Sequence, residues 1–297
     1  MPPPRGEQYR ERSVTDDQRR TNGSTEQRAF LRRILGQAAG GLGVELDGDV
    51  IFGWWDRTIG SAAIGDGTRL WLRATAEHHD WARGEVWTGN VDAAVITGVP
   101  KPDLVDRVEW TEAPVVIYAE LLSYIPDPPC SPTPELTTQF DPPDTWWSEL
   151  RTAVNELATQ PTPRGEHDPQ TYLRELEDLY ERPLDVPIPE LRTEHTDLHW
   201  ANLTQPRLWL LDWEYWGSAP AGYGPALLYC HSLLVPATAT RVHDVFADVL
   251  DTPTGQLAQL AAAAHILNRA HRMGDYPALR DPVRQLTQQI LTSLEGR

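Results

Sequence analysis

The hydrophobic pattern of the first ~120 residues predicts one helix followed by short strands. Apolar residues at positions 30, 31, 34, 35 and 38 recur at helical spacing, Ser24 is a suitable N-cap, and Gly40-Gly41 ends the helix. Beyond it, the pattern predicts strands over 50–54, 59–64, 70–75, 108–110 and 115–121, and a helix over 80–95. Gly65-Asp66-Gly67 is typical of a tight hairpin turn. This region therefore predicts a small, mainly antiparallel sheet with one intervening helix.

The pattern changes after a segment at 125–134 that holds five prolines and cannot be helix interior. Helices are predicted from Asp144 and from Asp168-Pro169, each beginning at a capping residue, and over 225–235, 241–250, 255–273 and 281–294. The chain thus divides into a polar, Arg-rich tail expected to be disordered (1–23), an N-terminal lobe (24–122) and a helical C-terminal lobe (123–297).

Two motifs between the predicted helices combine the residue types that phosphoryl transfer requires. The first, His195-x-Asp197-x-x-x-x-Asn202, is followed by an apolar strand over 208–211 that ends in Asp212, ten residues after the Asn. One carboxylate can orient an attacking hydroxyl and accept its proton. An amide oxygen and a second carboxylate are hard ligands that suit Mg²⁺ bound to nucleotide phosphates.

These motifs resemble the aminoglycoside phosphotransferase family. HTDLHWANL is similar to the family's HGDLHxxN catalytic loop, LLDWE to its IDWE metal-binding segment, and 217–228 to the loop and helix that follow. The resemblance implies an α+β, two-lobe protein-kinase-like fold, with a small β-rich N-lobe and a large helical C-lobe that clasp MgATP between them.

The resemblance also implies a role for each motif residue. Asp197 is expected as the catalytic base, Asn202 and Asp212 as Mg²⁺ ligands, and His195 as a structural brace of the loop. Two other interpretations stay open: His195 and His199 as a zinc pair on a helix, which would need a third ligand, and the motif residues as ordinary turn and cap residues.

The N-terminal lobe departs from the family pattern. The family expects a Lys on the third strand, paired with a Glu on the next helix, whereas the chain has Arg73 there, with Glu85 at the helix position. Arg keeps the charge but is not equivalent to Lys, so Arg73 either binds the phosphates or is a solvated strand residue. The adenine is expected near 117–121, at Ala119 and Leu121, where backbone groups and not side chains would recognise the base. Gly224 stands near a position where many relatives carry Asp.

The composition limits the classes of molecule that the protein is expected to bind. The chain has 43 acidic and 26 basic residues, which gives a net charge of −17. This charge disfavours binding to nucleic acid and to anionic membranes, and it attracts cationic substrates. No apolar run of about 18 residues and no secretory signal is visible. The two cysteines are expected to be reduced, and the protein cytoplasmic.

The leading functional hypothesis is an ATP-dependent O-phosphotransferase acting on a small hydroxylated molecule, foremost an aminoglycoside-like cationic antibiotic, as a monomer or homodimer. The alternatives are a kinase of another small alcohol or nucleoside, and a catalytically weak, nucleotide-binding homologue with a regulatory role. A polar helical face formed by His265, Asn268, Arg269 and Arg272 could line a substrate cleft, although a solvated face is the favoured interpretation.

Overall fold

The computed structural model describes residues 25–165 and 167–295, which form two compact units. One unit comprises residues 25–94 and 102–126, and the other comprises 95–101 and 127–295. The boundary expected between residues 122 and 123 differs from this division in two segments. Residues 123–126 belong to the first unit, and residues 95–101 belong to the second. There Leu210 N–H donates to Pro100 O at 2.8 Å. The expected tail and the Ser24 cap lie outside the described residues.

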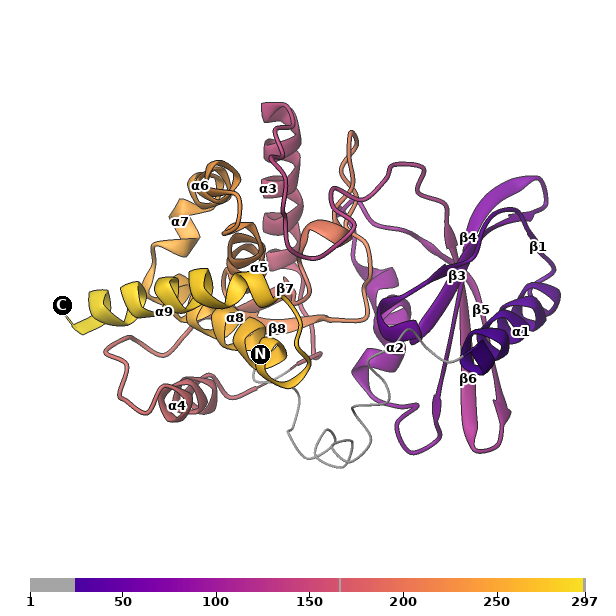
Figure 1. Cartoon of the computed structure of the whole chain (residues 1–297), viewed down its shortest axis with the longest axis horizontal. Coiled ribbons are helices and arrows are strands. Elements are labelled where there is room, and N and C mark those ends of the chain that lie inside the picture. Colours follow the sequence, from indigo (N-terminus) through magenta and orange to yellow (C-terminus); the bar gives the residue numbers. More distant parts are fainter. Residues whose placement is uncertain (1–24, 166, 296–297) are drawn as a thin grey trace. The chain divides into compact units, whose positions relative to one another are not determined.

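The N-terminal unit is built on one antiparallel sheet, as expected (Figure 1). Its strands are β1 Glu45–Leu46, β2 Ile51–Phe52, β3 Thr58–Gly65, β4 Thr68–His78, β5 Leu104–Glu112 and β6 Val115–Ser123. Their order is β1-β3-β4-β6-β5, with β2 also paired to β3. Asp66 and Gly67 both have positive φ, 49° and 72°, so the expected hairpin turn joins β3 to β4.

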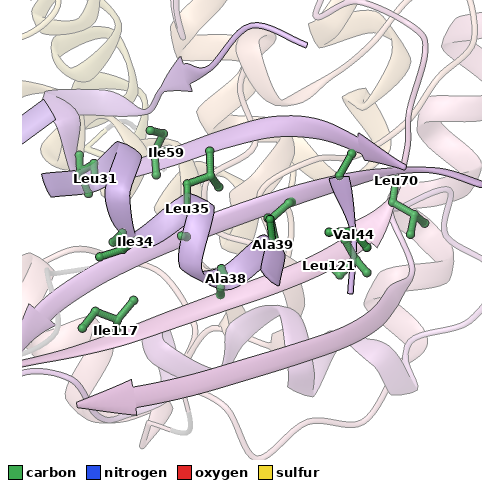
Figure 2. Packing of buried hydrophobic residues seen from close by; sticks show 14 residues of the cluster. Leu31, Ile34, Leu35, Ala38, Ala39, Val44, Ile59, Leu70, Ile117 and Leu121 are labelled. Carbon is green, nitrogen blue, oxygen red and sulfur yellow. The ribbon is translucent and has the colours of Figure 1, made fainter. Parts of the chain in front are cut away.

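The helix α1 (Thr25–Gly41) packs on one face of this sheet (Figure 2). Its buried residues at helical spacing meet alternate residues of the strands, and all of them belong to one hydrophobic cluster. The cluster includes Leu31, Ile34, Leu35 and Ala38 of α1, Leu70, Leu72 and Ala74 of β4, and Ile117, Ala119 and Leu121 of β6. Because side chains alternate along a strand, this packing turns Trp71 and Arg73 to the other face.

The intervening helix begins later than the sequence pattern predicts. Helix α2 spans Glu85–Asp92 and is followed by η4 (Ala93–Val95). The preceding residues form a turn in which the N–H groups of Trp81 and Ala82 both donate to His78 O, at 2.8 and 2.9 Å. Gly84 leaves this turn with φ 84°, a conformation that glycine adopts without strain.

The C-terminal unit is mainly helical, as expected. Its elements are α3 Asp144–Thr159, α4 Pro169–Leu179, α5 Tyr223–Ser232, α6 Pro236–Val245, α7 Ala247–Leu250, α8 Pro253–Arg272, α9 Arg280–Glu295, η5 Trp200–Asn202 and η6 Pro277–Leu279. Asp168 caps α4 by accepting from Thr171 N–H at 3.0 Å, as predicted. Asp144 lies inside α3 instead of capping it, and the helix predicted over 241–250 begins earlier and is interrupted at Phe246.

A two-stranded antiparallel ribbon, not predicted from the pattern, carries the first motif. Strand β7 (Leu191–His195) pairs with β8 (Trp216–Pro220), so that His195 lies opposite Trp216. The apolar run 208–211, expected as a strand, is extended chain that makes one isolated bridge, Leu203 with Leu210. Among the described residues, no helix is both long enough and apolar enough to cross a membrane.

Candidate functional site

The two sequence motifs meet through the backbone of one residue, Leu211. Leu211 N–H donates to Asn202 O at 2.8 Å, and Leu211 O accepts from His195 Nε2 at 3.0 Å. The residue before Asp212 is thereby fastened to the end of the catalytic-type loop and to its first histidine. His195 is 2% exposed, and its contact agrees with the expected bracing role.

The side-chain amide of Asn202 has an orientation that its neighbours fix. Its Nδ2 group donates to Asp197 O at 3.0 Å and lies 3.4 Å from Asp197 Oδ2. Both partners can only accept hydrogen bonds, so the NH₂ group must face them. The amide oxygen is consequently turned away from the loop and is available as a hard ligand for a cation.

Asp197 lies at the surface of the loop, with its side chain 29% exposed and His199 Nε2 3.5 Å from its Oδ2. Burial alone would raise the pKa of Asp197, but the charge of His199 and its hydrogen bond outweigh burial and hold this pKa well below its usual range. The carboxylate therefore stays ionised throughout the physiological pH range.

Asp212 occupies a backbone conformation that few residues adopt. Its φ is 59°, in the left-handed region, where Asp and Asn are tolerated better than other non-glycine residues. Its carboxylate makes no hydrogen bond or ion pair with any residue in the described part of the chain. A strained residue with an uncommitted carboxylate, which follows the residue bonded to Asn202 at the end of η5, is typical of a functional site.

Two buried tryptophans, Trp200 and Trp213, pack against the two motifs. The Trp200 ring is fully buried, and its Nε1–H donates to Ser232 Oγ at 3.0 Å. Trp213 Nε1–H donates to Leu210 O at 2.8 Å, and the Trp213 ring meets the His195 ring edge-on, with centroids 5.0 Å apart. The residues on either side of the site are therefore held by packing as well as by the backbone.

The zinc interpretation does not match this arrangement. His195 ends strand β7, whereas His199 precedes the short helix η5 with an extended backbone, φ −151° and ψ 172°. The helical i, i+4 spacing that would place both imidazoles on one face is therefore not formed. His195 Nε2–H also donates to Leu211 O at 3.0 Å, so this nitrogen has no lone pair free for a metal.

The polar face of α8 is only partly the solvated face that was favoured from the sequence. Arg272 is exposed, but the Arg269 side chain is 28% exposed, forms an ion pair with Asp275 at 3.0 Å and lies over the ring of Tyr276. His265 and Arg269 both interact electrostatically with Asp197. This face therefore borders the site.

A series of ring contacts leads from His199, beside Asp197, to Tyr276, which lies against Arg269 on the polar face of α8. The ring of His199 lies 5.7 Å from the ring of His231, which lies 5.1 Å from that of Tyr276, centroid to centroid. Burial lowers the pKa of His231 well below its usual value, so a neutral imidazole is buried here. Tyr276 has φ 50°, a left-handed conformation that is unusual for an aromatic residue. The sequence analysis gave His199 no role in the phosphotransferase motif and did not single out His231 or Tyr276.

Glu194 anchors the loop to the start of α5 and was not singled out in the sequence. Its carboxylate accepts from Gly222 N–H at 2.7 Å and Gly224 N–H at 3.0 Å. A Cβ at position 224 would lie 3.2 Å from Glu194 Oε2 and 3.2 Å from His195 O, so there is little room for a side chain. The glycine at the position where many relatives carry Asp therefore accommodates the carboxylate of Glu194.

Arg164 is a second missed residue that shapes the segment after Asp212. It is 5% exposed, and it donates to Glu214 O at 3.1 Å and to Trp216 O at 3.2 Å. Its guanidinium also lies over the Trp216 ring, 4.7 Å from the centroid. Only its position in the folded chain, far from both motifs in sequence, reveals this role.

In the N-terminal unit, Arg73 is not a solvated strand residue. It lies opposite Glu120 in the β4–β6 register, with Nη1 3.4 Å from Glu120 Oε2 and side-chain exposures of 16% and 2%. Asn90 of α2 also donates to Glu120 Oε2, at 2.7 Å. Glu85, the helix residue expected to pair with Arg73, is the exposed first residue of α2, and its pairing with Arg73 stays a prediction. Glu120 and Asn90 were not predicted.

The side chains of Ala119 and Leu121 are core residues, whereas the adenine-binding role expected of this segment belongs to its backbone. Both belong to the middle of β6, which pairs with β4 on one side and β5 on the other. Their side chains are 0% and 3% exposed within the core beneath α1. These side chains serve the packing of the sheet, and adenine binding by the backbone of this segment stays a prediction.

No protein-family model matches the chain, and no curated protein matches it in sequence. Solved structures do match it. The aminoglycoside phosphotransferase APH(4)-Ia, in a ternary complex with AMP-PNP and hygromycin B, aligns with a TM-score of 0.60 and 14% identity, covering 87% of this chain and 97% of that one. The choline kinase LicA from Streptococcus pneumoniae aligns with a TM-score of 0.54 and 15% identity, covering 89% and 99%.

These similarities establish the class of fold, since they span nearly the whole of both known structures. The chain has the protein-kinase-like fold of the aminoglycoside phosphotransferases and related small-molecule kinases, as the sequence motifs implied. At this level of identity the likeness concerns the fold, and the activity must be argued from the residues of the site.

Proposed function

We propose that the protein is an ATP-dependent O-phosphotransferase of small molecules. The observation that carries the proposal is the joining of the two motifs by the Leu211 backbone, with Asp197 ionised beside an oriented Asn202 and an uncommitted Asp212 carboxylate. Phosphoryl transfer depends mainly on positioning and charge stabilisation, and these three groups supply both.

In this proposal Asp197 holds the acceptor hydroxyl by a hydrogen bond and receives its proton. The hydroxyl oxygen forms a bond to the γ-phosphorus of ATP, and the bond from that phosphorus to the bridging oxygen of ADP breaks. Asn202, through its amide oxygen, and Asp212 would hold Mg²⁺, whose chemistry is to neutralise the charge of the phosphates. Asn202 also links the two functions, because its NH₂ group fixes the Asp197 backbone.

For the substrate, we propose a small hydroxylated molecule with cationic groups, foremost an aminoglycoside-like antibiotic. The net charge of −17 supports this class, because an acidic protein concentrates cations near its surface. The two similar structures are named for an aminoglycoside and for choline, and both of these molecules carry positive charge and a hydroxyl. Other small alcohols and nucleosides are the alternative substrates.

The decisive experiment measures Mg²⁺-dependent ADP release with a panel of aminoglycosides, choline-like alcohols, sugars and nucleosides. We expect one class to raise the ADP release rate above the background of ATP hydrolysis, with a phosphorylated product detected by mass spectrometry. ADP release that no hydroxylated compound stimulates, together with no phosphorylated product, would count against the proposal.

The second candidate, a nucleotide-binding homologue with weak catalysis, is favoured by Arg73 at the position where the family has Lys. If Arg73 acts on the phosphates, Arg73→Ala should raise the KM for ATP and lower kcat, whereas Arg73→Lys should retain or improve activity. Because Arg73 also faces the buried carboxylate of Glu120, a thermal melt of each variant is needed to separate loss of fold from loss of function. Equal activity of Arg73→Ala and wild type would remove Arg73 from the site.

A further inference from the structure

The turn after β4 brings together three consecutive side chains of metal-ligand type. One ligand atom from each of His78, His79 and Asp80 lies within 4.8 Å of the others. His78 Nδ1 is 3.3 Å from Asp80 Oδ2, and His79 Nε2 is 3.1 Å from Asp80 Oδ1. These residues belong to the N-terminal unit and have no role in the proposed phosphotransferase chemistry.

The hydrogen bonds of the two imidazoles show which nitrogens carry lone pairs. His79 Nδ1 lies 3.3 Å from Pro114 O, and a carbonyl oxygen only accepts, so the proton is on Nδ1. In the neutral ring, Nε2 then points an unprotonated lone pair at the Asp80 carboxylate. His78 Nδ1 accepts from Asp80 N–H at 3.4 Å, so it is the unprotonated nitrogen of its ring, and a cation at Nδ1 would take the place of this long hydrogen bond.

Three acceptors that face one another repel unless a positive charge lies between them. A divalent cation bound to all three would turn each repulsion into an attraction. Tetrahedral Zn²⁺ with ligands at about 2.0–2.1 Å separates neighbouring ligand atoms by about 3.3 Å. The two imidazole nitrogens lie 3.3 and 3.1 Å from different oxygens of Asp80, and one ligand atom from each residue falls within 4.8 Å of the others, so small side-chain rotations bring the set to this spacing.

The backbone holds the three side chains in place without a metal. Pro114 O accepts from the His79 N–H at 3.1 Å as well as from the ring, so one carbonyl fixes both. Such an outer contact of a ligating histidine orients the ring and fixes its tautomer. The His78 carbonyl closes the turn with Trp81 and Ala82, and the two imidazole rings lie 4.3 Å apart, centroid to centroid.

We propose that His78, His79 and Asp80 bind one divalent transition-metal ion of the Zn²⁺, Ni²⁺ or Co²⁺ class. Two imidazoles and one carboxylate suit these ions, whereas Mg²⁺ and Ca²⁺ prefer sets of oxygen ligands. His79 and Asp80 have side chains 59% and 62% exposed, so an ion reaches the site directly from solvent. Three protein ligands leave the fourth coordination position of the ion open to water or another small ligand.

The test uses full-length, metal-free protein without a polyhistidine tag and a competitive Zn²⁺ titration against a chromophoric indicator, in excess Mg²⁺. Excess Mg²⁺ saturates oxygen-ligand sites such as the one proposed at Asn202 and Asp212. We expect one Zn²⁺ per chain to be lost, or its affinity to fall at least about tenfold, in His79→Ala and in Asp80→Asn. His243→Ala is the matched control, because His243 Nε2 also faces a carboxylate, Asp251 Oδ1 at 3.0 Å, but without a second imidazole.

A second measurement locates the ion. The Trp81 ring lies 5.7 Å from the His78 ring, so Ni²⁺ or Cu²⁺ bound at this site should quench the fluorescence of Trp81. The quenching should be smaller in Trp81→Phe and absent in His79→Ala, and Zn²⁺ should raise the melting temperature of wild type but not of His79→Ala. Unchanged Zn²⁺ affinity in His79→Ala would show that the ion binds elsewhere, and no binding by the wild type would show that protons alone balance the cluster. Either result would overturn the proposal.

Discussion

At the scale of single residues, Asp197 and Asp212 have different environments in the candidate site. Asp197 is held by Asn202 and His199 and has a lowered pKa, whereas Asp212 has a strained backbone and an uncommitted carboxylate. The proposed function assigns the hydroxyl to the first and the cation to the second. Substitutions of the two residues should therefore have different effects.

Asp197→Asn should lower kcat by about 10² to 10⁴ while leaving MgATP affinity nearly unchanged, because the residue serves the acceptor and not the metal. Steady-state kinetics and calorimetry with MgATP check both halves of this expectation. Asp185→Asn, at an exposed carboxylate in the same unit, should behave as wild type. Turnover of Asp197→Asn close to that of wild type would contradict the assignment.

For Asp212, both Asn and Ala should weaken Mg²⁺-dependent nucleotide binding, because each removes the charged ligand. The two variants should differ in stability. Asn tolerates the left-handed backbone at φ 59°, whereas Ala should lose about 1 kcal/mol of unfolding free energy. Calorimetry with MgATP and a thermal melt separate the effects, and unchanged nucleotide affinity in Asp212→Ala would refute the ligand role.

At the scale of elements, the junction of β7 with α5 decides where the catalytic-type loop lies. Glu194, the residue before His195, accepts two N–H groups at the beginning of α5, a position where the helix dipole also favours negative charge. The contact joins segments almost 30 residues apart in sequence. Its cost is the burial of a carboxylate that is 2% exposed.

The burial of Glu194 predicts a pH dependence of stability. Burial raises the pKa of Glu194 from 4.5 to about 7, against the opposing effect of the two N–H groups. The folded state therefore binds this proton more tightly than the unfolded state. The stabilisation is complete below about pH 4.5 and is lost as the pH rises through 7, by about 3 kcal/mol in total.

Glu194→Gln should flatten the pH dependence of unfolding free energy between pH 4.5 and 7.5, since the amide cannot ionise. Denaturant unfolding at a series of pH values measures this effect. Glu190→Gln, at an exposed carboxylate at the other end of β7, is the control and should keep the wild-type slope. If Glu194→Gln also keeps that slope, Glu194 titrates normally in the folded protein.

At the scale of the whole molecule, the charge of −17 should act on the approach of substrate. For any polycationic substrate, an increase in ionic strength from about 0.05 to about 0.5 M should raise KM, because salt shortens the range of attraction between exposed charges. The KM for a neutral substrate should change little under the same conditions. Equal KM values at both ionic strengths for a polycation would show that the overall charge has no part in substrate choice.

The sequence by itself was sufficient for the class of fold and for the motif residues. Helical spacing in α1, alternation in β4 and the Asp66-Gly67 turn are local properties, set by side-chain periodicity and backbone sterics. The chemistry of Asp197, Asn202 and Asp212 was also legible, because their residue types and spacing are what a phosphate-bound cation and an attacking hydroxyl require. The roles of these three remain predictions.

The polar contacts within each unit could be found only from the folded chain. Glu120 beside Arg73, Glu194 beneath Gly224 and Arg164 behind Trp216 are contacts between distant segments, and none leaves a periodic trace in the sequence. Similarly, Ala119 and Leu121 look like any strand residues until the packing of α1 shows that their side chains are core. Periodicity records which face of an element is apolar, whereas polar contacts depend on how the elements are brought together, and that is decided by the packing of the whole chain.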